Sequence, residues 1–550
     1  MALNRRLKLE ERLATALPAG CRFIIHHLST PPTPRRAIFA APPREKSDDT
    51  YCESHFLSVS IDSAGDGTQL QVFAIEVLIY TTEFLTTLFV SKADSTGYLY
   101  LLKLPKGTPS PLKTISTTFL QYLIEERRRP DRRLVLSLFA RAQNQYLFPG
   151  SVENIHKHVL DDRGLIKWWC KVVDPILGTS QDHSEVPVHK QHGITRNGQE
   201  IKSHGFLRVP GCDRYETRGF LPKREDGRVD EGRWSMTDPL LILAKSPSLP
   251  ERCLIPRFPD DPKARFVYQL DDELPYDELQ SPQLLAEENT PEKHKPGRWR
   301  SVQSLEEFWE MMSFRQECSS GRLVGFLWAT FQPAILYGAH NSMDVEEGAQ
   351  KTTQSALPKP LDSHYLEASR LPPQSPLRSN LVPEALYKSQ APPMSPSKQS
   401  PDSTPVILNG SRTQPEWIKS EETKDFYWPT SSRGELIVSS KHYQRVGNLL
   451  LRLDYANQVI AEESTKKWID DVAKQAGAKH WGYPVVGSRV KMDATVDTNP
   501  KKRAAEGDTA VIAVQANGIN TLSTGLVRKK AKVATDPGPT RSIKAESSGT

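Results

Sequence analysis

Runs of apolar residues in the first third of the chain predict β-strands. Residues 56–61 and 70–80 are rich in β-branched and aromatic side chains, and the segment 63–67 between them contains two glycines and an aspartate. Two such runs around a turn that needs positive φ values predict a β-hairpin. A further strand is expected over 85–90, directly before the polar segment 91–94.

Helical spacing of apolar residues begins after these strands. Residues 112–127 carry Ile115, Phe119 and Leu123 at intervals of four, which is typical of a helix with one buried face. We interpret the apolar run 134–140 as the continuation of a helix.

The middle of the chain alternates between polar and apolar stretches. A helix is expected within 154–173, centred on 166–169, whereas the polar, histidine-rich stretch 178–204 is expected to be an exposed loop. Residues 304–314 predict a clear helix, because Ser304 can cap it and Leu305, Phe308, Trp309 and Met312 share one face.

The composition changes near Gly338. Twelve prolines lie between Pro358 and Pro415, among many serines, glutamines and lysines. Such a stretch cannot bury enough apolar surface to offset the entropy lost on ordering. We interpret 338–430 as a disordered insertion within a domain that begins with a core over 1–337.

An apolar helical pattern returns after the insertion. Ser432 and Glu435 have the spacing of a capping box, and apolar residues recur at helical intervals over 433–473. We expect the segment 431–490 to dock on the core through this helix. The loop between them is long, but the entropy cost of closing a loop grows only slowly with its length.

Charge is concentrated at the end of the chain. The net charge is +6, and residues 499–550 hold nine lysines and arginines against four acidic residues. The rest of the chain is therefore almost neutral, which argues against a basic nucleic-acid-binding domain. We expect 491–550 to be a disordered basic tail, in which 501–503 and 528–533 resemble nuclear-import signals.

Several classes of protein are disfavoured by composition. The six cysteines are scattered and form no CxxC pair, and His156 with His158 lacks further metal ligands nearby, so no metal site is expected. No run of 18 apolar residues occurs, and Met1–Glu10 lacks the apolar core of a signal peptide. We expect a protein that stays inside the cell.

Five short segments carry a resemblance to a known family. In chain order they are FVSKAD (89–94), QYLFP (145–149), KWW (167–169), LRVPG (207–211) and FPDDPKARF (258–266). Together they resemble the fungal regulator-of-Ty-transposition histone acetyltransferases, which are structurally related to the CREB-binding-protein acetyltransferases. No Gly-rich loop of the commoner N-acetyltransferase superfamily is evident.

The resemblance implies a fold and a reaction. The implied fold is a single α/β acetyltransferase domain with a central mixed β-sheet surrounded by helices. The implied reaction moves an acetyl group from acetyl-CoA to lysines of histone H3, with H4, and uses no metal. The family works in the nucleus with histone chaperones of the anti-silencing and nucleosome-assembly types, in replication-coupled chromatin assembly and the DNA-damage response.

The resemblance also implies site residues, and each has a plainer interpretation. The acetyl-transfer site would include Asp94, Tyr146, Trp169, Asp260 and Asp261, and the donor would contact Lys92, Ala93, Arg141, His158 and Trp168. The aromatic residues could equally be core residues, and the aspartates could be turn or cap residues. Lys263 matches a lysine that the family's enzymes acetylate on themselves; the plainer alternative is a surface ion pair.

The sequence allows two other functions. A nuclear scaffold with the same fold but no catalysis would bind histones or chaperones through its disordered parts. A sequence-specific DNA-binding protein is disfavoured, because no basic face, metal site or helix-turn-helix signature is evident.

Overall fold

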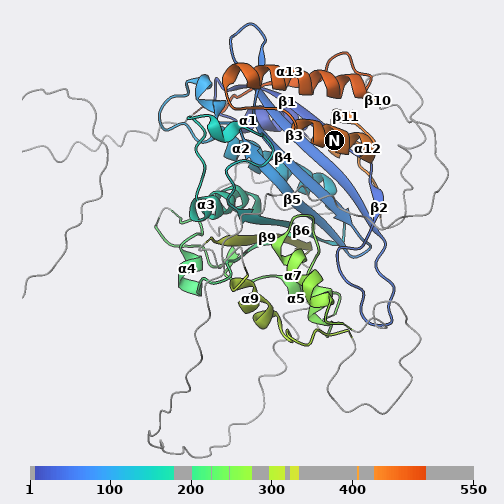
Figure 1. The fold of residues 1–550 in the computed structure, drawn as a ribbon. Helices are drawn as coiled ribbons and strands as arrows, with labels where there is room; N and C mark the ends of the chain where they lie inside the picture. The colour runs from blue at the N-terminus through green and yellow to red at the C-terminus, as the bar shows by residue number, and fades with distance from the viewer. Residues whose placement is uncertain are drawn as a thin grey trace, which may run out of the picture. The chain divides into compact units, whose positions relative to one another are not determined.

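A central mixed β-sheet organises the computed structural model of this protein (Figure 1). The structure describes residues 7–178, 201–224, 226–246, 248–274, 297–315, 322–333 and 426–490, together with the backbone of 406 and 407. The strands are β1 (Arg22–Ser29), β2 (Thr33–Arg35), β3 (Thr50–Asp62), β4 (Gln69–Thr81), β5 (Leu85–Ser95), β6 (Arg133–Arg141), β7 (Ile201–Arg208), β8 (Trp234–Ser235), β9 (Val324–Pro333), β10 (Val406–Ile407), β11 (Leu436–Ile437) and β12 (Tyr483–Val486).

The order of strands in the sheet is β10-β11-β1-β3-β4-β5-β6-β9-β7-β8, with β12 beside β1 and β2 beside β3. The pairs β5–β6, β1–β11 and β7–β8 are parallel, and the other neighbours are antiparallel. The expected hairpin is β3–β4, and Gly65 and Gly67 in its turn have φ values of +82° and +92°. The predicted mixed sheet surrounded by helices is therefore confirmed.

Helices pack on both faces of this sheet. They are α1 (Leu9–Ala16), α2 (Pro111–Arg127), α3 (Asp162–Val173), α4 (Arg214–Arg218), α5 (Leu240–Leu243), α6 (Glu251–Leu254), α7 (Pro262–Asp271), α9 (Leu305–Ser313), α12 (Ser440–Leu450) and α13 (Gln458–Gln475), with short 3₁₀ turns at η1 (Tyr98–Leu102), η2 (Ser151–Glu153), η3 (Asp174–Leu177) and η5 (Thr430–Ser432). The predicted helix at 304–314 is confirmed as α9, which Ser304 caps by accepting the N–H of Glu307.

Alternation along β9 shows how the core is divided. Leu327, Ala329 and Phe331 face one hydrophobic cluster, to which α2 and α3 contribute, whereas Phe326 and Trp328 face a second cluster with α7 and α9. Strands that are covered on both faces read as continuous apolar runs. The interpretation of 134–140 as helical was wrong for this reason: the run is β6, buried on both faces, and periodicity alone does not separate such a strand from a buried helix.

The chain after the insertion differs from the expected single helix. Ser439, not Ser432, caps α12, and the helical pattern is divided into α12 and α13. Glu435 accepts the backbone N–H of Gly482 at 2.8 and 2.9 Å, because the chain here forms β11 beside β1. Residues 201–204, expected in a loop, belong to β7.

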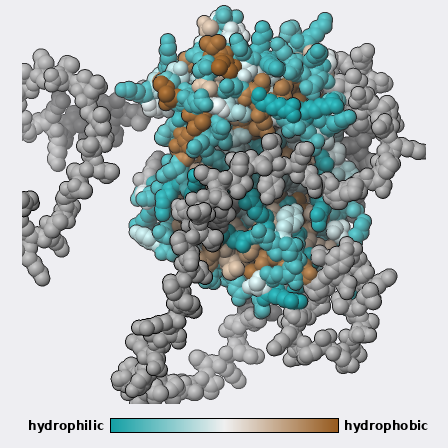
Figure 2. Space-filling view, in the orientation of Figure 1, coloured by the Kyte–Doolittle hydropathy of each residue, from teal (hydrophilic) through white to brown (hydrophobic). Residues whose placement is uncertain are grey.

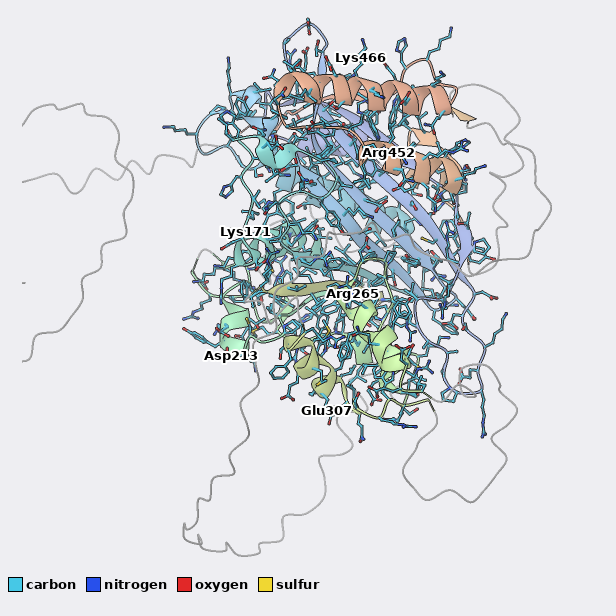
Figure 3. All side chains as sticks on the ribbon, in the orientation of Figure 1. Lys171, Asp213, Arg265, Glu307, Arg452 and Lys466 are labelled. Carbon is cyan, nitrogen blue, oxygen red and sulfur yellow. The ribbon has the colours of Figure 1, made fainter. Side chains whose placement is uncertain are left out.

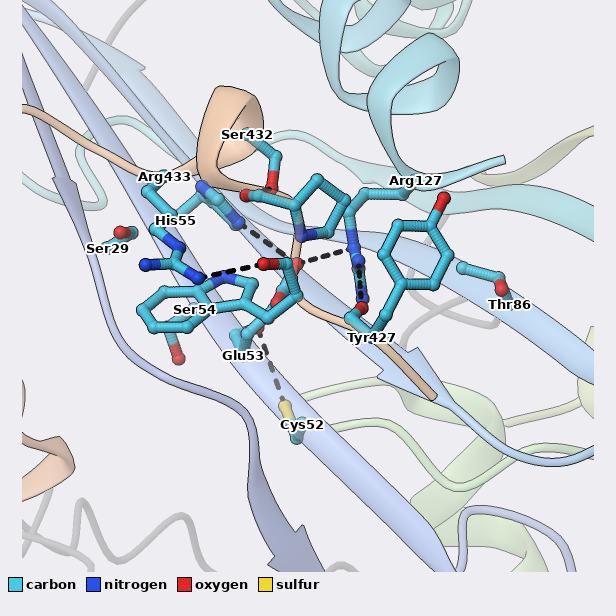
Figure 4. Close-up of polar contacts among 12 residues, drawn as sticks. Ser29, Cys52, Glu53, Ser54, His55, Thr86, Arg127, Tyr427, Ser432 and Arg433 are labelled. Carbon is cyan, nitrogen blue, oxygen red and sulfur yellow. Dashed lines mark hydrogen bonds and ion pairs between the residues drawn. The ribbon is translucent and has the colours of Figure 1, made fainter. Parts of the chain in front are cut away.

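A buried charged cluster fixes the point where the chain returns to the core (Figure 4). Glu53 on β3 and Arg127 on α2 form an ion pair of 2.8 Å, and their side chains are 1% and 3% exposed. His55 lies 3.3 Å from the same carboxylate, and Arg127 donates to the carbonyl of Tyr427 at 2.8 Å. Burial opposes ionisation of Glu53, but the charge of Arg127 and the His55 hydrogen bond lower its pKa.

Residues 426–430, which composition assigned to the insertion, thus pack on the sheet. Phe426 and Trp428 are buried beside Ile437, and the guanidinium of Arg433 lies 4.1 Å from the Trp428 ring centroid. The rest of the expected insertion, apart from β10, and the whole basic tail lie outside the described residues. Among the described helices none is long and apolar enough to cross a membrane, and the face in Figure 2 is mostly hydrophilic.

Candidate active site

Asp94 joins the end of β5 to the segment that follows β6. Its Oδ2 accepts the backbone N–H groups of Tyr146, Leu147 and Phe148 at 2.7, 2.9 and 3.3 Å. Its Oδ1 accepts from Lys157 Nζ at 3.0 Å. A carboxylate with this many donors is fixed in one orientation. Asp94 therefore positions Tyr146 beside β5.

A β-bulge precedes Asp94 and brings two charged side chains together. Glu76 on β4 lies opposite Lys92, but Val77 lies opposite Val90, so Ser91 is the extra residue. Lys92 Nζ donates to Glu76 Oε2 at 3.0 Å and lies 3.9 Å from Asp260 Oδ2. Burial lowers the pKa of Lys92, but the charge and hydrogen bond of Glu76, together with Tyr146 and Asp260, outweigh burial and raise it. Bulges redirect side chains in this way next to functional sites.

Tyr146 lies within reach of the same charges. Burial raises the pKa of its phenol, and the charge of Asp260 adds to this effect, while Lys92 and Arg141 oppose it. Tyr146, Lys92, Arg141 and Asp260 are therefore brought together from three parts of the chain. Four of the residues named from sequence share one locality.

The two neighbouring aspartates have different surroundings. Asp260 has φ +58° and a side chain that is 56% exposed. Asp261 is buried and caps α7, since its Oδ1 accepts the N–H of Lys263 at 2.9 Å. The Lys263 ammonium lies 2.7 Å from the other Asp261 oxygen and 4.2 Å from the Phe326 ring centroid. Burial lowers the pKa of Lys263, although Asp261 opposes the shift.

Lys263 is thus buried in an ion pair and does not lie in a surface cluster, which was the plainer alternative. Only Asp260 of the two carboxylates is exposed enough to meet an incoming cation. An αL conformation at a residue other than glycine costs about 1–2 kcal/mol. The strained backbone of Asp260 thus lies where its side chain comes close to Lys92 and Tyr146.

A cavity of about 650 Å³ opens beside these residues. Asp260 and Asp261 line it, as does Arg265 of α7, which is labelled in Figure 3. Its apolar lining includes Ile38, Leu78, Tyr80 and Phe258, its basic lining Arg35, Arg36 and Arg257, and its α12 lining Ser440, Tyr443 and Gln444. The lining of this cavity therefore combines apolar side chains with two carboxylates and four guanidinium groups.

The other residues named from sequence lie in varied positions. Trp169 is buried in the same hydrophobic cluster as Leu147 and Phe148, and its ring meets Trp168 edge-on at 4.8 Å. The guanidinium carbon of Arg141 lies 5.5 Å from the ring centroid of Phe139. Ala93 in β5 lies opposite Ile75 in β4. His158 is exposed beyond η2. Within the described residues, the contacts named here do not connect Trp169 or His158 to Asp260.

Three residues at the site were missed from the sequence. Glu76 could have been noticed, because it is an isolated carboxylate within the apolar strand QVFAIEVLIY and such groups need a partner. Lys157 and Tyr443 gave no signal, since their partners Asp94 and Glu76 lie 63 and 367 positions away. Among the described residues no group of three or more His, Cys, Asp or Glu is arranged to hold a metal ion.

Comparison with known proteins decides the family. The sequence model of the histone acetyltransferase KAT11-type domain matches residues 9–134 and 130–471, which include every site residue described above. The chain belongs to the KAT11-type histone acetyltransferase family. The resemblance inferred from five short segments is confirmed, and so is the prediction of an acetyltransferase.

Relatives of this KAT11-type enzyme match most of its length. "Histone acetyltransferase rtt109" of Aspergillus flavus is 42% identical over 583 aligned positions, which cover 95% of this chain and 99% of that protein. "Histone acetyltransferase rtt109" of Schizosaccharomyces pombe is 31% identical over 314 positions, which cover 57% and 69%.

A solved structure agrees with the fold. The crystal structure of Rtt109 from Aspergillus fumigatus is 39% identical, with a TM-score of 0.61, and the match covers 88% of this chain and 99% of that one. As an acetyltransferase the KAT11-type enzyme uses acetyl-CoA as its co-substrate. Its site must therefore hold a thioester and an amine against each other.

Proposed function

We propose that this enzyme transfers the acetyl group of acetyl-CoA to lysines of histone H3 within H3–H4. The amine nitrogen attacks the thioester carbonyl, the C–S bond breaks, and CoA leaves as the thiol while an amide forms. The histone part of this proposal is supported by the family and by the printed names of the relatives. The choice of H3 rests on the sequence resemblance.

The acceptor lysine must lose a proton before it can attack. A lysine with an ordinary pKa near 10.4 needs about 4–5 kcal/mol to be deprotonated at pH 7. Asp260 supports binding of the ammonium, because it is exposed on the cavity wall beside Tyr146. A carboxylate also raises the pKa of a nearby lysine, so we assign Asp260 to placement and not to proton removal.

The donor would lie where β5 and β6 part. Their parallel pairing runs to Val90 and Leu138, although β5 continues to Ser95 and β6 to Arg141. Backbone groups at such an opening suit the amides of an extended pantetheine arm, with Ala93 on its edge. We assign Arg141 and His158 to contact with the phosphates, because a guanidinium and an imidazole both offer N–H donors. Lys92 fits this role less well, because Glu76 already holds its ammonium.

Two further site residues have structural support for indirect roles. Asp94 would act as a positioning residue, since it holds the backbone of 146–148. Trp169 would shape the channel together with Trp168, because it contacts Trp168 and is buried in the same hydrophobic cluster as Leu147 and Phe148. We propose Lys263 as a site of self-acetylation, which would remove the charge of an ammonium that is buried beside Asp261.

Cellular context completes the proposal. We propose a nuclear enzyme that receives H3–H4 from histone chaperones of the anti-silencing and nucleosome-assembly types, in replication-coupled chromatin assembly and the DNA-damage response. The basic segments 501–503 and 528–533 support nuclear import. We also propose the division into a core over 1–337, an insertion from 338, a docking segment up to 490 and a tail over 491–550, with the start of the docking segment moved from 431 to 426 because Phe426 and Trp428 pack on the sheet.

One observation supports the catalytic proposal: Asp94 holds the backbone of Tyr146, and Tyr146 and Lys92 lie close to Asp260, which lines the cavity. The test measures transfer of label from acetyl-CoA to H3–H4, with and without chaperone, for the wild type and Asp260→Asn. The variant should lose about 10-fold or more in kcat/KM, mainly through KM for the histone.

The matched control is Asp272→Asn, which removes an exposed carboxylate at the other end of α7. It should leave the kinetics unchanged. Absence of label in H3 under all conditions would refute the proposed function. Equal activity of Asp260→Asn and wild type would remove Asp260 from the acceptor site.

A further inference from the structure

Glu76 is a carboxylate in the middle of an apolar strand, and both of its oxygens are engaged. Its side chain is only 12% exposed. Oε2 accepts from the Lys92 ammonium at 3.0 Å, and Oε1 accepts from the Tyr443 hydroxyl at 2.9 Å. A partly buried carboxylate with two donors is strongly oriented. Glu76 therefore has one conformation, which points toward Lys92.

Lys92 has a second carboxylate within reach. Asp260 Oδ2 lies 3.9 Å from its ammonium, which is beyond the distance of a hydrogen bond. Glu76 and Asp260 thus compete for one cation, and Glu76 holds it. Asp260, whose side chain is 56% exposed, lies on the cavity wall.

Tyr443 provides the other fixed point. It lies on α12, which follows the long segment outside the described residues, and with Ser440 and Gln444 it lines the cavity. Burial raises the pKa of its phenol, and the charge of Glu76 raises it further, so the hydroxyl remains a donor at physiological pH. The helix thereby contacts Glu76 through the Tyr443 hydroxyl.

We infer that Glu76, oriented by Tyr443, is a positioning residue that holds Lys92 away from Asp260 and so leaves Asp260 free to attract the acceptor ammonium. The inference rests on the proposed function, because it assumes that Asp260 meets the acceptor. It also gives α12 a role in acceptor binding: the helix does more than cover the sheet.

The first test is Glu76→Gln, which keeps the size of the side chain but removes its charge. Lys92 should then pair with Asp260, and KM for H3–H4 should rise about tenfold, the factor expected for losing a hydrogen bond to a charged group. KM for acetyl-CoA should not rise. Glu76→Asp keeps the charge and should recover part of the lost affinity for the histone.

The second test is Tyr443→Phe, which removes only the hydroxyl. KM for H3–H4 should rise by about threefold, since Glu76 keeps its charge but loses one orienting bond. The matched control is Tyr455→Phe. Tyr455 also belongs to the chain after the insertion, and its hydroxyl donates to Gln71 Oε1 on the same strand β4 at 2.6 Å. This control should leave KM for the histone unchanged.

The outcomes separate this inference from the proposed function. Wild-type enzyme that does not label H3–H4 refutes the proposed function, whatever the variants do. Wild-type activity with an unchanged histone KM in both Glu76→Gln and Tyr443→Phe overturns the inference alone. Equal rises in histone KM for Tyr443→Phe and Tyr455→Phe also overturn it, because they would indicate a general loosening of the segment.

Discussion

The buried pair of Glu53 and Arg127 should contribute strongly to stability when one partner is removed. The ion pair is 2.8 Å long, and both side chains are almost completely buried. Glu53→Gln keeps the volume but leaves the guanidinium without a counter-charge, which costs about 3–5 kcal/mol for a buried pair. A typical domain is stable by only about 5–15 kcal/mol, so the loss should be plain.

Urea unfolding followed by tryptophan fluorescence measures this loss at pH 7. The matched control is Asp49→Asn, whose partner Lys46 lies 3.3 Å away with both side chains more than four-fifths exposed. Water and salt screen such a pair, so its unfolding midpoint should not move. A loss below about 1 kcal/mol for Glu53→Gln would refute the reasoning, since that is the range of exposed pairs.

The same variant should show a defined pH dependence. The folded-state pKa of Glu53 lies below its ordinary value of 4.5, so between these two pKa values the unfolded chain binds more protons than the folded one. The stability from this group is present above pH 4.5 and is lost as pH falls through the depressed pKa. The difference between wild type and Glu53→Gln should therefore shrink in acid.

Three other substitutions test local features. Asp94→Ala removes the acceptor of three backbone N–H groups and leaves the Lys157 ammonium buried, so steady-state assays should show kcat/KM lowered by about 100-fold or more, and thermal unfolding a lower midpoint. Gly434→Ala would place a Cβ 2.6 Å from the His27 carbonyl oxygen, so urea unfolding should show a free energy of unfolding lower by about 1–3 kcal/mol. Gly447→Ala is the matched control: the site in α12 has open space, so the free energy of unfolding should stay unchanged or rise by up to about 1 kcal/mol.

Local patterns predicted local structure well. The hairpin of β3 and β4 and the helix α9 follow from turn residues, a cap and spacing within a few positions. The run 134–140 was misinterpreted because a strand buried on both faces has no alternation to reveal it. The boundary at 430 was placed too late, because Phe426 and Trp428 are anchored by residues hundreds of positions earlier.

The site residues also differ in how far the sequence could identify them. Asp94, Tyr146 and Asp260 were found only because short segments resembled a family, and the structure then placed them together. Composition could not have distinguished Asp260 from Asp261, since the difference lies in a backbone φ value and in the burial of Lys263. The bond between Glu76 and Tyr443 spans 367 positions, and no local pattern predicts such a contact.

The edge of β1 is completed by the end of the described chain. Arg22–Ile25 pair with β12, and Leu28 and Ser29 pair with β11. The partners of this N-terminal strand thus lie more than 400 positions later in the sequence. The ribosome must therefore synthesise more than 400 further residues before β1 can pair with β11 and β12. Until then the nascent chain carries an open strand edge, a natural place for a folding chaperone to hold it.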